Sequence, residues 1–300
     1  MGICLHVAAR TDAGRVRNEN EDAFLTADFT RGEILSNLPV YRGRVDVGDR
    51  GALVALSDGV RGATAGDVAS ALVLSSLAKA LTESDVASES PRQAVVGAVE
   101  QAHRAVWRRA CGQGIEMGAT LAAAYVLGEF AYVAEVGDSR AYLLRSGKFT
   151  QLTKDQSYVR MLLDGGAVTE GEAKTLPRRH VVLQAMGIQP SVSVAIGRLE
   201  LRDRDCLLLC SDGLTSTLED DEIRAAILES PTLENAAERL VAIANDRGGE
   251  DNITAVLVGV GGGLPTSQPC ASTGQTCRIL ETFEPYEAPR QEGGGTARVT

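Results

Sequence analysis

Hydrophobic positions along this chain fall into short runs and longer, helically spaced segments. The short runs, apolar or alternating with polar residues, predict strands at 4–10, 22–28, 52–57, 181–185, 192–200 and 206–211, and in the final run ITAVLVGV. The longer segments predict helices at about 66–82, 219–229 and 233–246, and within ESPRQAVVGAVEQAHRAVWRRACGQG. In this last helix Ser90 is the expected N-cap, Pro91 the first position and Gln93 the partner in a capping box.

The order of these elements indicates the fold class. Between residues 119 and 153, four strand-like pieces (ATLAAAYVLG, FAYVAEVG, SRAYLLRSG and KFTQLT) are separated only by short turns. Such strands must pair antiparallel, because parallel neighbours need a long crossover. Strands in runs and helices in pairs predict an α+β fold, which we expect to be a four-layer α-β-β-α sandwich of two antiparallel sheets flanked by helices.

Two stretches stand apart from this pattern. Residues 261–300 contain 7 Gly and 4 Pro, so we expect a folded domain over 1–260 and a disordered Gly/Pro/Thr-rich tail over 261–300. The apolar segment CRILETFEPYEAP inside the tail is either inert or a docking peptide. The stretch 29–51 carries four Arg and is interpreted as a mobile surface loop, with contact to a substrate as the alternative.

Charge and composition narrow the class of function. The net charge of -10 argues against nucleic-acid binding, which depends on Lys and Arg neutralising phosphates. No apolar run reaches the roughly 18–20 residues of a membrane span, and the N-terminus lacks a signal pattern, so a cytoplasmic protein is expected. The six cysteines form no CxxC pair, which predicts free thiols rather than a zinc site or a disulfide framework.

Acidic residues recur where predicted strands begin or end. Two apolar strands stop at the same tripeptide, Ser57-Asp58-Gly59 and Ser211-Asp212-Gly213, and further acids flank strands as Glu21-Asp22, Asp138 and Asp251-Asn252. One Asp-Gly at a strand end is usually a turn. Several gathered carboxylates would instead repel each other and suit a hard cation, Mg²⁺ or Mn²⁺. Arg17 could hold a phosphate beside them with its planar fork.

With these motifs in this order, the chain resembles the metal-dependent Ser/Thr protein phosphatases of type 2C in their bacterial form. The resemblance covers about residues 6–260 and rests on TDAGRVRNENEDAF, LSDGVRGATAGDVAS, MGATLAAAYV, VGDSRAYLLRSGKFTQLTKD, LLLCSDGL and GGEDNITAVLV. It implies a signalling hydrolase acting on phosphoserine and phosphothreonine in phosphorylated proteins, and opposing a bacterial Ser/Thr kinase.

The resemblance also implies a role for each acid, in an enzyme whose metal-bridging hydroxide attacks phosphorus in line. It implies that Asp58 bridges two ions, that Asp212 and Asp251 bind the first, and that Glu21 and the Gly59 carbonyl bind the second. Asp22 would bind the waters of the second ion, and Asp138 with Asp212 would bind a third ion where one is present. Arg17 would bind the phosphate, and Asn252 would support the ligands from behind. Gly59 has no Cβ, so its backbone oxygen can approach a metal.

Some positions depart from the family pattern. Arg61 stands where a glycine is usual, Val60 where some eukaryotic relatives have a histidine, and Gln156 where a histidine is common. The proton donor to the leaving oxygen is therefore unassigned, and a metal-bound water is the hypothesis. Arg61 also motivates the alternative of an inactive phosphoprotein-binding pseudophosphatase, against which the intact acids argue.

One further pattern points to a different chemistry. The stretch CLHVAAR has the Cys-x5-Arg spacing of cysteine-dependent phosphatases, with Cys4 as nucleophile. Those enzymes need a loop of backbone N–H groups around the phosphate, leading into a helix. This stretch has no glycine and alternates as a strand, so the interpretation is disfavoured.

Overall fold

The computed structural model describes residues 2–36, 38–60, 65–84, 90–173, 176, 181–266 and 276–284. The strands are β1 (Cys4–Asp12), β2 (Ala23–Asp28), β3 (Glu33–Ser36), β4 (Val40–Asp46), β5 (Ala52–Ser57), β6 (Leu121–Leu127), β7 (Phe130–Val136), β8 (Arg140–Arg145), β9 (Lys148–Gln151), β10 (Ala195–Glu200), β11 (Cys206–Cys210), β12 (Ile253–Gly261) and β13 (Cys277–Glu281). The helices are α1 (Gly66–Glu83), α2 (Pro91–Gln113), α3 (Tyr158–Asp164), α4 (Glu170–Ala173), α5 (Asp212–Thr215), α6 (Asp220–Glu229) and α7 (Leu233–Asp246).

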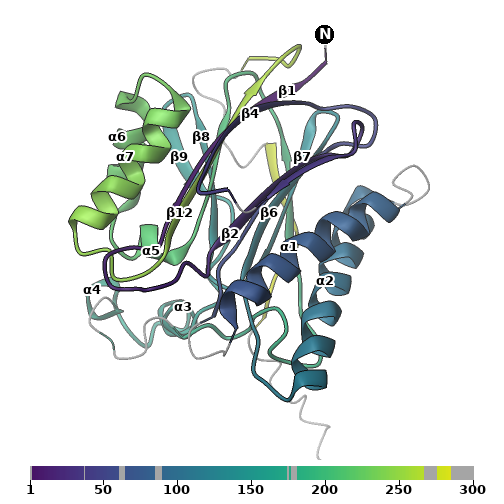
Figure 1. Ribbon diagram of the computed structural model, residues 1–300. Helices are drawn as coiled ribbons and strands as arrows, with labels where there is room; N and C mark the ends of the chain where they lie inside the picture. The colour runs from purple at the N-terminus through teal and green to yellow at the C-terminus, as the bar shows by residue number, and fades with distance from the viewer. Residues whose placement is uncertain are drawn as a thin grey trace, which may run out of the picture.

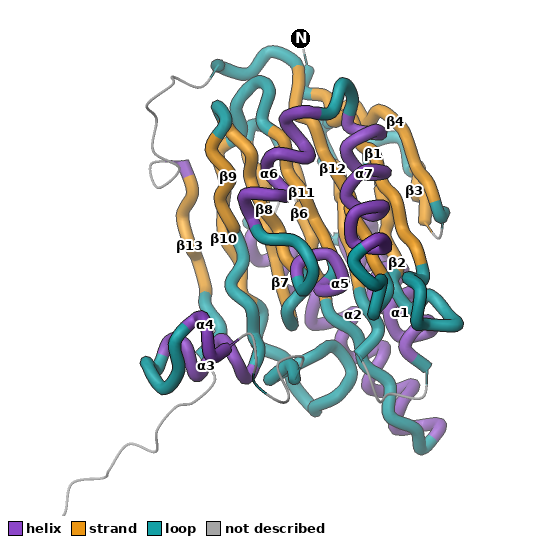
Figure 2. The backbone as a smooth tube through the Cα atoms, turned by 90° about the vertical axis from the view of Figure 1, so that its left-hand side faces the viewer, coloured by secondary structure: helices purple, strands orange, loops and turns teal. Residues whose placement is uncertain are grey.

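The strands form two antiparallel sheets that pack face to face. One sheet has the order β4-β1-β12-β11-β8-β9 and the other the order β13-β10-β7-β6-β5-β2-β3. Helices α1 and α2 cover the outer face of the second sheet, and α6 and α7 cover the first (Figures 1 and 2). The expected four-layer α+β sandwich is confirmed.

The alternation of side chains along each strand explains why the core has separate layers. In β5, Leu53 and Ala55 pack toward the helices, whereas Val54 and Leu56 pack between the sheets. Successive side chains of a strand point to opposite faces, so a strand buried on both faces is apolar throughout. All six residues of β5 are buried, as its uninterrupted apolar run predicts.

The predicted helices are confirmed with small changes at their ends. Ser90 accepts a hydrogen bond from the Gln93 N–H and Pro91 begins α2, as the capping box predicts. No strand forms at 181–185, and the predicted strand 192–200 shortens to β10. The side-chain amide of Gln184 donates to the Ser193 carbonyl at 2.6 Å and accepts from the Ser193 N–H at 3.1 Å. The backbone of Ser193 therefore bonds to a side chain instead of to a neighbouring strand.

The stretch 29–51 is more ordered than the loop interpretation expected. Within it β3 pairs with β2 and β4 pairs with β1, so the chain crosses from the edge of one sheet to the edge of the other. The surface-loop prediction is therefore wrong for these two strands. Polar and apolar residues are both exposed in β3 and β4, because both strands lie at sheet edges. Their sequences therefore show no regular alternation of apolar and polar positions.

Part of the segment expected to be a disordered tail also belongs to the fold. Strand β13 pairs antiparallel with β10 at the edge of its sheet, with α3 and α4 beyond its end (Figure 2). Cys277 packs into the core between the sheets, Leu280 packs on the helix side, and Glu281 pairs with Arg92 of α2. Disorder is thus wrong for 277–281, while residues 267–275 and 285–300 lie outside the described residues.

Two expectations about location and chemistry can be compared with this fold. None of the helices in the described part of the chain combines the length and the apolar content that a bilayer crossing requires. Cys4 lies buried in β1, with no helix following it, so the loop that a cysteine-dependent phosphatase needs is not formed there.

Candidate functional site

The fold brings the acids named in the sequence to one end of the sandwich. Asp58 follows β5 and Asp212 follows β11, where it opens the short helix α5. Glu21 and Asp22 directly precede β2, Asp251 precedes β12, and Asp138 lies in the turn between β7 and β8. Because the two sheets are stacked, strand ends from both come together there.

Asp58 is the point at which these charges meet. Removal of its carboxyl from water raises its pKa well above the ordinary value, and the charges of four other acids raise it further: Asp22, Asp212, Asp138 and Asp251. The pKa of Asp138 is raised in the same way, first by burial and then by Asp212. Acids far apart in sequence are therefore near enough for their charges to interact.

Asp22 is the most enclosed of the acids. Burial raises its pKa from 3.8 to about 7, partly offset by hydrogen bonds from two hydroxyls. Thr254 donates to Oδ2 at 2.6 Å and Ser211 donates to the same oxygen at 2.7 Å. Oδ1 is buried and has no hydrogen-bond partner among the described residues. One oxygen of Asp22 is thus held by two hydroxyls, and the carboxyl also lies within hydrogen-bonding reach of Asp58.

The repeated Asp-Gly pairs have a steric explanation. A Cβ on Gly59 would lie 2.8 Å from the Glu21 Cβ, and one on Gly213 would lie 2.1 Å from the Asn252 carbonyl oxygen. The Gly59 N–H also donates to the Glu21 carbonyl at 3.3 Å. Each glycine therefore lets another acid-bearing segment approach closely. Val60 follows in the same turn, whereas Arg61 lies outside the described residues.

Arg17 contacts an acid in this structure. Its Nε lies 3.0 Å from Asp251 Oδ1, and its Nη2 donates to Oδ2 at 3.4 Å. Burial raises the pKa of Glu21, and the nearby Arg17 charge partly offsets that rise. Arg17 therefore interacts with both of the acids that the resemblance assigns to different ions.

Asn252 connects the segments that carry these residues. Its Oδ1 accepts from the Glu21 N–H at 2.8 Å, and its Nδ2 donates to the carbonyls of Glu19 at 2.8 Å and Ala13 at 3.0 Å. The side chain thus fixes the segment carrying Arg17 and Glu21 against the start of β12. This supports the expected position of Asn252 behind the acids.

Sequence reasoning missed the hydroxyls that position the acids. Thr120 accepts from the Asp58 N–H at 3.0 Å, and its hydroxyl lies 2.6 Å from that of Ser139, which follows Asp138. Thr120 therefore links the turns that carry two of the acids. The available signal was a polar residue at the start of an apolar run, which Thr254 in DNITAVLV shares.

Gln156, which replaces a common histidine, supports the turn before Asp138. Its side-chain oxygen accepts from the Gly137 N–H at 2.7 Å, and its own N–H donates to the Gly137 carbonyl at 2.9 Å. Gln184 donates to the same side-chain oxygen at 2.8 Å. In this chain the side-chain amide of Gln156 therefore stabilises the turn before Asp138.

The donor set fits a hard divalent ion. It consists of carboxylates, one of which has an oxygen with no partner among the described residues, and the electrostatic cost of grouping them falls when a cation is present. Within the described ranges, no group of three or more acidic, histidine or cysteine side chains is arranged so that it could hold a metal ion by itself. Waters would therefore complete the coordination, which suits Mg²⁺ because it keeps several waters when protein carboxylates bind it.

Comparison with known proteins places this geometry in a family. The sequence model described as protein phosphatase 2C matches residues 42–257. The serine/threonine phosphatase stp of Listeria innocua is 33% identical over 85% of this chain and 95% of its own length. The serine/threonine protein phosphatase PstP of Mycobacterium tuberculosis is 34% identical over 86% of this chain and 45% of its own length.

Solved structures agree with the sequences. The M. tuberculosis phosphatase PstP/Ppp superimposes with a TM-score of 0.72 at 34% identity, covering 86% of this chain and 100% of that one. The catalytic domain of PstP in complex with two manganese ions gives 0.70 at 33% identity, covering 87% and 100%. Stp1 of Staphylococcus aureus gives 0.71 at 30% identity, covering 85% and 95%. Fold, acids and relatives together establish that this chain belongs to the protein phosphatase 2C family.

Proposed function

We propose that this chain is a metal-dependent phosphatase that hydrolyses phosphoserine and phosphothreonine in proteins. The observation that carries the proposal is the meeting of four acids around Asp58, in a chain whose relatives are serine/threonine phosphatases. Because one of these relatives, PstP, is described in complex with two manganese ions, we propose Mn²⁺ or Mg²⁺ as the cofactor.

Each acid has a proposed place around the ions. Asp58 lies centrally and would serve both; Asp212 and Asp251 would hold one, Glu21 and the Gly59 carbonyl the other, and Asp138 with Asp212 a third. When bound, the ions would supply the positive charge that a phosphoryl group needs and lower the pKa of a coordinated water. The neighbouring charges that raise the pKa of Asp58 are the charges such ions would offset.

The chain's own residues would orient the substrate and water. Arg17 presents two nitrogen donors to Asp251, the same fork with which a guanidinium grips two phosphate oxygens. Oδ1 of Asp22 would accept a hydrogen bond from a metal-bound water, while Thr254 and Ser211 hold Oδ2. Asn252 would hold the segment that carries Arg17 and Glu21 in a fixed position relative to Asp251.

The test is hydrolysis of para-nitrophenyl phosphate and of phosphoserine, phosphothreonine and phosphotyrosine peptides with Mn²⁺, Mg²⁺ or EDTA. Asp212→Asn should lower kcat by about a hundredfold or more, judged from the scale of metal-assisted rate gains. Asp221→Asn, an exposed acid in the first turn of α6, is the control and should leave activity unchanged. Equal activity of the two variants would remove the metal-site assignment.

A binding module without turnover is not favoured. Its motivation was Arg61, which lies outside the described residues, whereas Asp58, Asp212 and Asp251 are all retained. Opposition to a Ser/Thr kinase follows from the proposed substrate class. Its test is the phosphorylation level of cellular proteins after deletion of the gene, which should rise at serine and threonine.

A further inference from the structure

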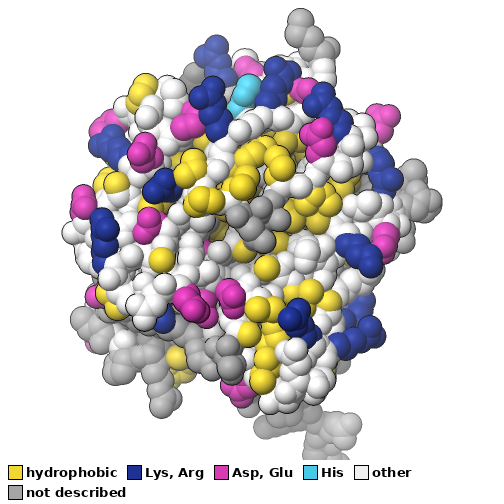
Figure 3. Space-filling model, in the orientation of Figure 1, with side chains coloured by type: hydrophobic (Ala, Val, Ile, Leu, Met, Phe, Trp, Pro, Cys, Tyr) yellow, Lys and Arg dark blue, Asp and Glu magenta, His cyan; other side chains and the backbone are white. Residues whose placement is uncertain are grey.

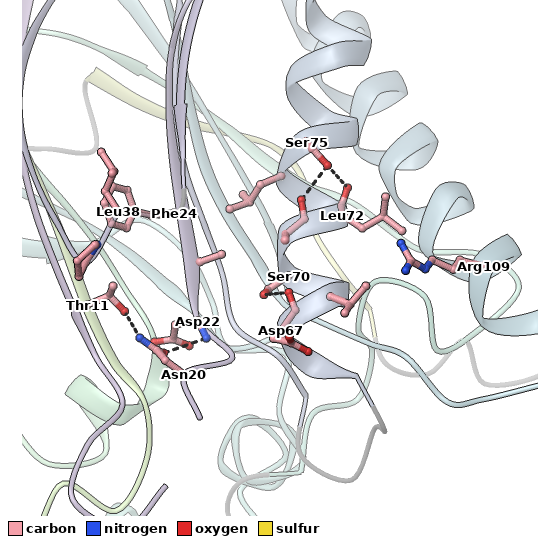
Figure 4. Close-up of a pocket in the computed structure, with 15 residues that line it drawn as sticks. Thr11, Asn20, Asp22, Phe24, Leu38, Asp67, Ser70, Leu72, Ser75 and Arg109 are labelled. Atoms are coloured by element: carbon pink, nitrogen blue, oxygen red, sulfur yellow. Dashed lines mark hydrogen bonds between the residues drawn. The ribbon is translucent and has the colours of Figure 1, made fainter. Parts of the chain in front are cut away.

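A surface groove of about 670 Å³ opens beside the acidic end of the sandwich. It lies between strand β2 and helix α1, with residues 38–39 at one end, and extends across α1 toward α2 (Figure 4). Its volume falls within the range of ligand-binding clefts. None of the roles proposed above uses this groove except through Asp22.

The floor of the groove is continuous with the proposed catalytic site. Asn20 and Asp22 line it, and the Asn20 amide donates to the Thr11 hydroxyl at 2.8 Å (Figure 4). Asp67, in the first turn of α1, lines the groove, and its neighbour Gly66 lies against the Glu21 carboxylate, since a Cβ there would be 2.7 Å from Glu21 Oε1. The groove therefore begins beside the proposed phosphate site.

Apolar side chains gather at the end of the groove away from the acids. Phe24, Leu38 and Pro39 line this end, and Leu38 is 38% exposed. Figure 4 shows Leu38 and Phe24 on the same side of the groove, and apolar side chains are visible on this face in Figure 3. An exposed leucine in a cleft can pack against an apolar side chain of a ligand.

The opposite side of the groove carries a positive charge. Arg109 of α2 is exposed, lines the groove beyond α1, and forms no ion pair with any carboxylate among the described residues. The chain as a whole has a net charge of -10, so an uncompensated arginine beside the site favours an acidic ligand group.

We propose that this groove binds the segment of a phosphoprotein substrate that flanks the phosphorylated residue, with an apolar side chain against Leu38 and an acidic group at Arg109. The inference rests on the proposed function and deepens it, because it names what the enzyme reads besides the phosphate. Continuity with Asp22 favours the substrate over a second copy of the chain, whose docking would cover the acids.

The test compares substrates that do and do not reach the groove. The variants are Leu38→Ser and Arg109→Glu; the matched controls are Leu228→Ser, an exposed leucine on α6, and Arg108→Glu, the exposed neighbour of Arg109 on α2. Substrates are para-nitrophenyl phosphate and three phosphothreonine peptides of equal length, flanked by leucine, by glutamate or by glycine and serine.

The expected results separate docking from catalysis. The wild type should hydrolyse the leucine-flanked peptide with a kcat/KM about tenfold above the glycine/serine peptide, as burial of one apolar side chain allows. Leu38→Ser should lower that preference several-fold and Arg109→Glu should lower kcat/KM for the glutamate-flanked peptide, both with para-nitrophenyl phosphate unaffected. Equal kcat/KM for all peptides, or equal effects of the controls, would overturn the docking site; absence of any turnover would instead overturn the proposed function.

Discussion

Replacement of Asp22 by asparagine should make the metal-free protein more stable while impairing the enzyme. Asp22 is 8% exposed, and burial raises its pKa from 3.8 to about 7. The folded protein therefore resists ionising this group, even though Thr254 and Ser211 donate to it. Asparagine keeps the shape and removes the charge.

The magnitude follows from the shift in pKa. From 3.8 to about 7 is a rise of about 3 units, which at about 1.36 kcal/mol per unit is on the order of 4 kcal/mol at most. Because the folded-state pKa lies above the unfolded value, the native state holds the proton longer as the pH rises. Asp22 therefore does not lower the free energy of unfolding below about pH 4. Its destabilising effect grows between about pH 4 and 7 and is complete above that window.

The assay is urea unfolding in EDTA at pH 5 and pH 8. Asp22→Asn should be more stable than the wild type by about 2–4 kcal/mol at pH 8, with a smaller difference at pH 5. Asp58 and Asp138, whose pKa values are also raised, should leave the variant with some pH dependence. A variant no more stable than the wild type at pH 8, with Asp221→Asn as the control, would refute the reasoning.

Three further outcomes are expected. Gly213→Ala should lower the free energy of unfolding by about 1–3 kcal/mol and lower activity, because its Cβ would lie 2.1 Å from the Asn252 carbonyl oxygen. Gly97→Ala is the control: it has open space around it in α2 and should stabilise the protein by about 0.5–1 kcal/mol, both variants being compared by thermal melting. Arg145→Met should cost about 3–5 kcal/mol in urea unfolding, because it strands the buried Asp205 carboxylate; a loss below 1 kcal/mol would contradict this. Mn²⁺ should raise the melting temperature of the wild type, and an unchanged value in EDTA would argue against metal binding.

Local patterns were sufficient for much of the fold. The period of apolar residues located α1, α2, α6 and α7 within a residue or two, and the capping box at Ser90 formed as expected. Helix periodicity and capping depend on residues three or four apart, so they survive in the sequence alone. The acids at Asp58 and Asp212 stood out for a similar reason, since each ends a strongly apolar strand.

Edge strands and long-range pairs were beyond such patterns. Strands β3, β4 and β13 form because β2, β1 and β10 offer them backbone partners, and a half-exposed edge strand needs little apolar alternation. The ion pair of Arg140 is also long-range, because its Nε and Nη2 donate to Asp155 at 2.7 and 2.6 Å.

The sequence by itself determined which residue types could carry the chemistry and on which strand ends they would stand. Only the tertiary structure decided that Thr254 and Ser211 would hold Asp22, that Arg17 would contact Asp251, and that a groove would lead away from them. These contacts join residues up to 234 positions apart. No local periodicity encodes them, because they exist only once both sheets have paired and stacked.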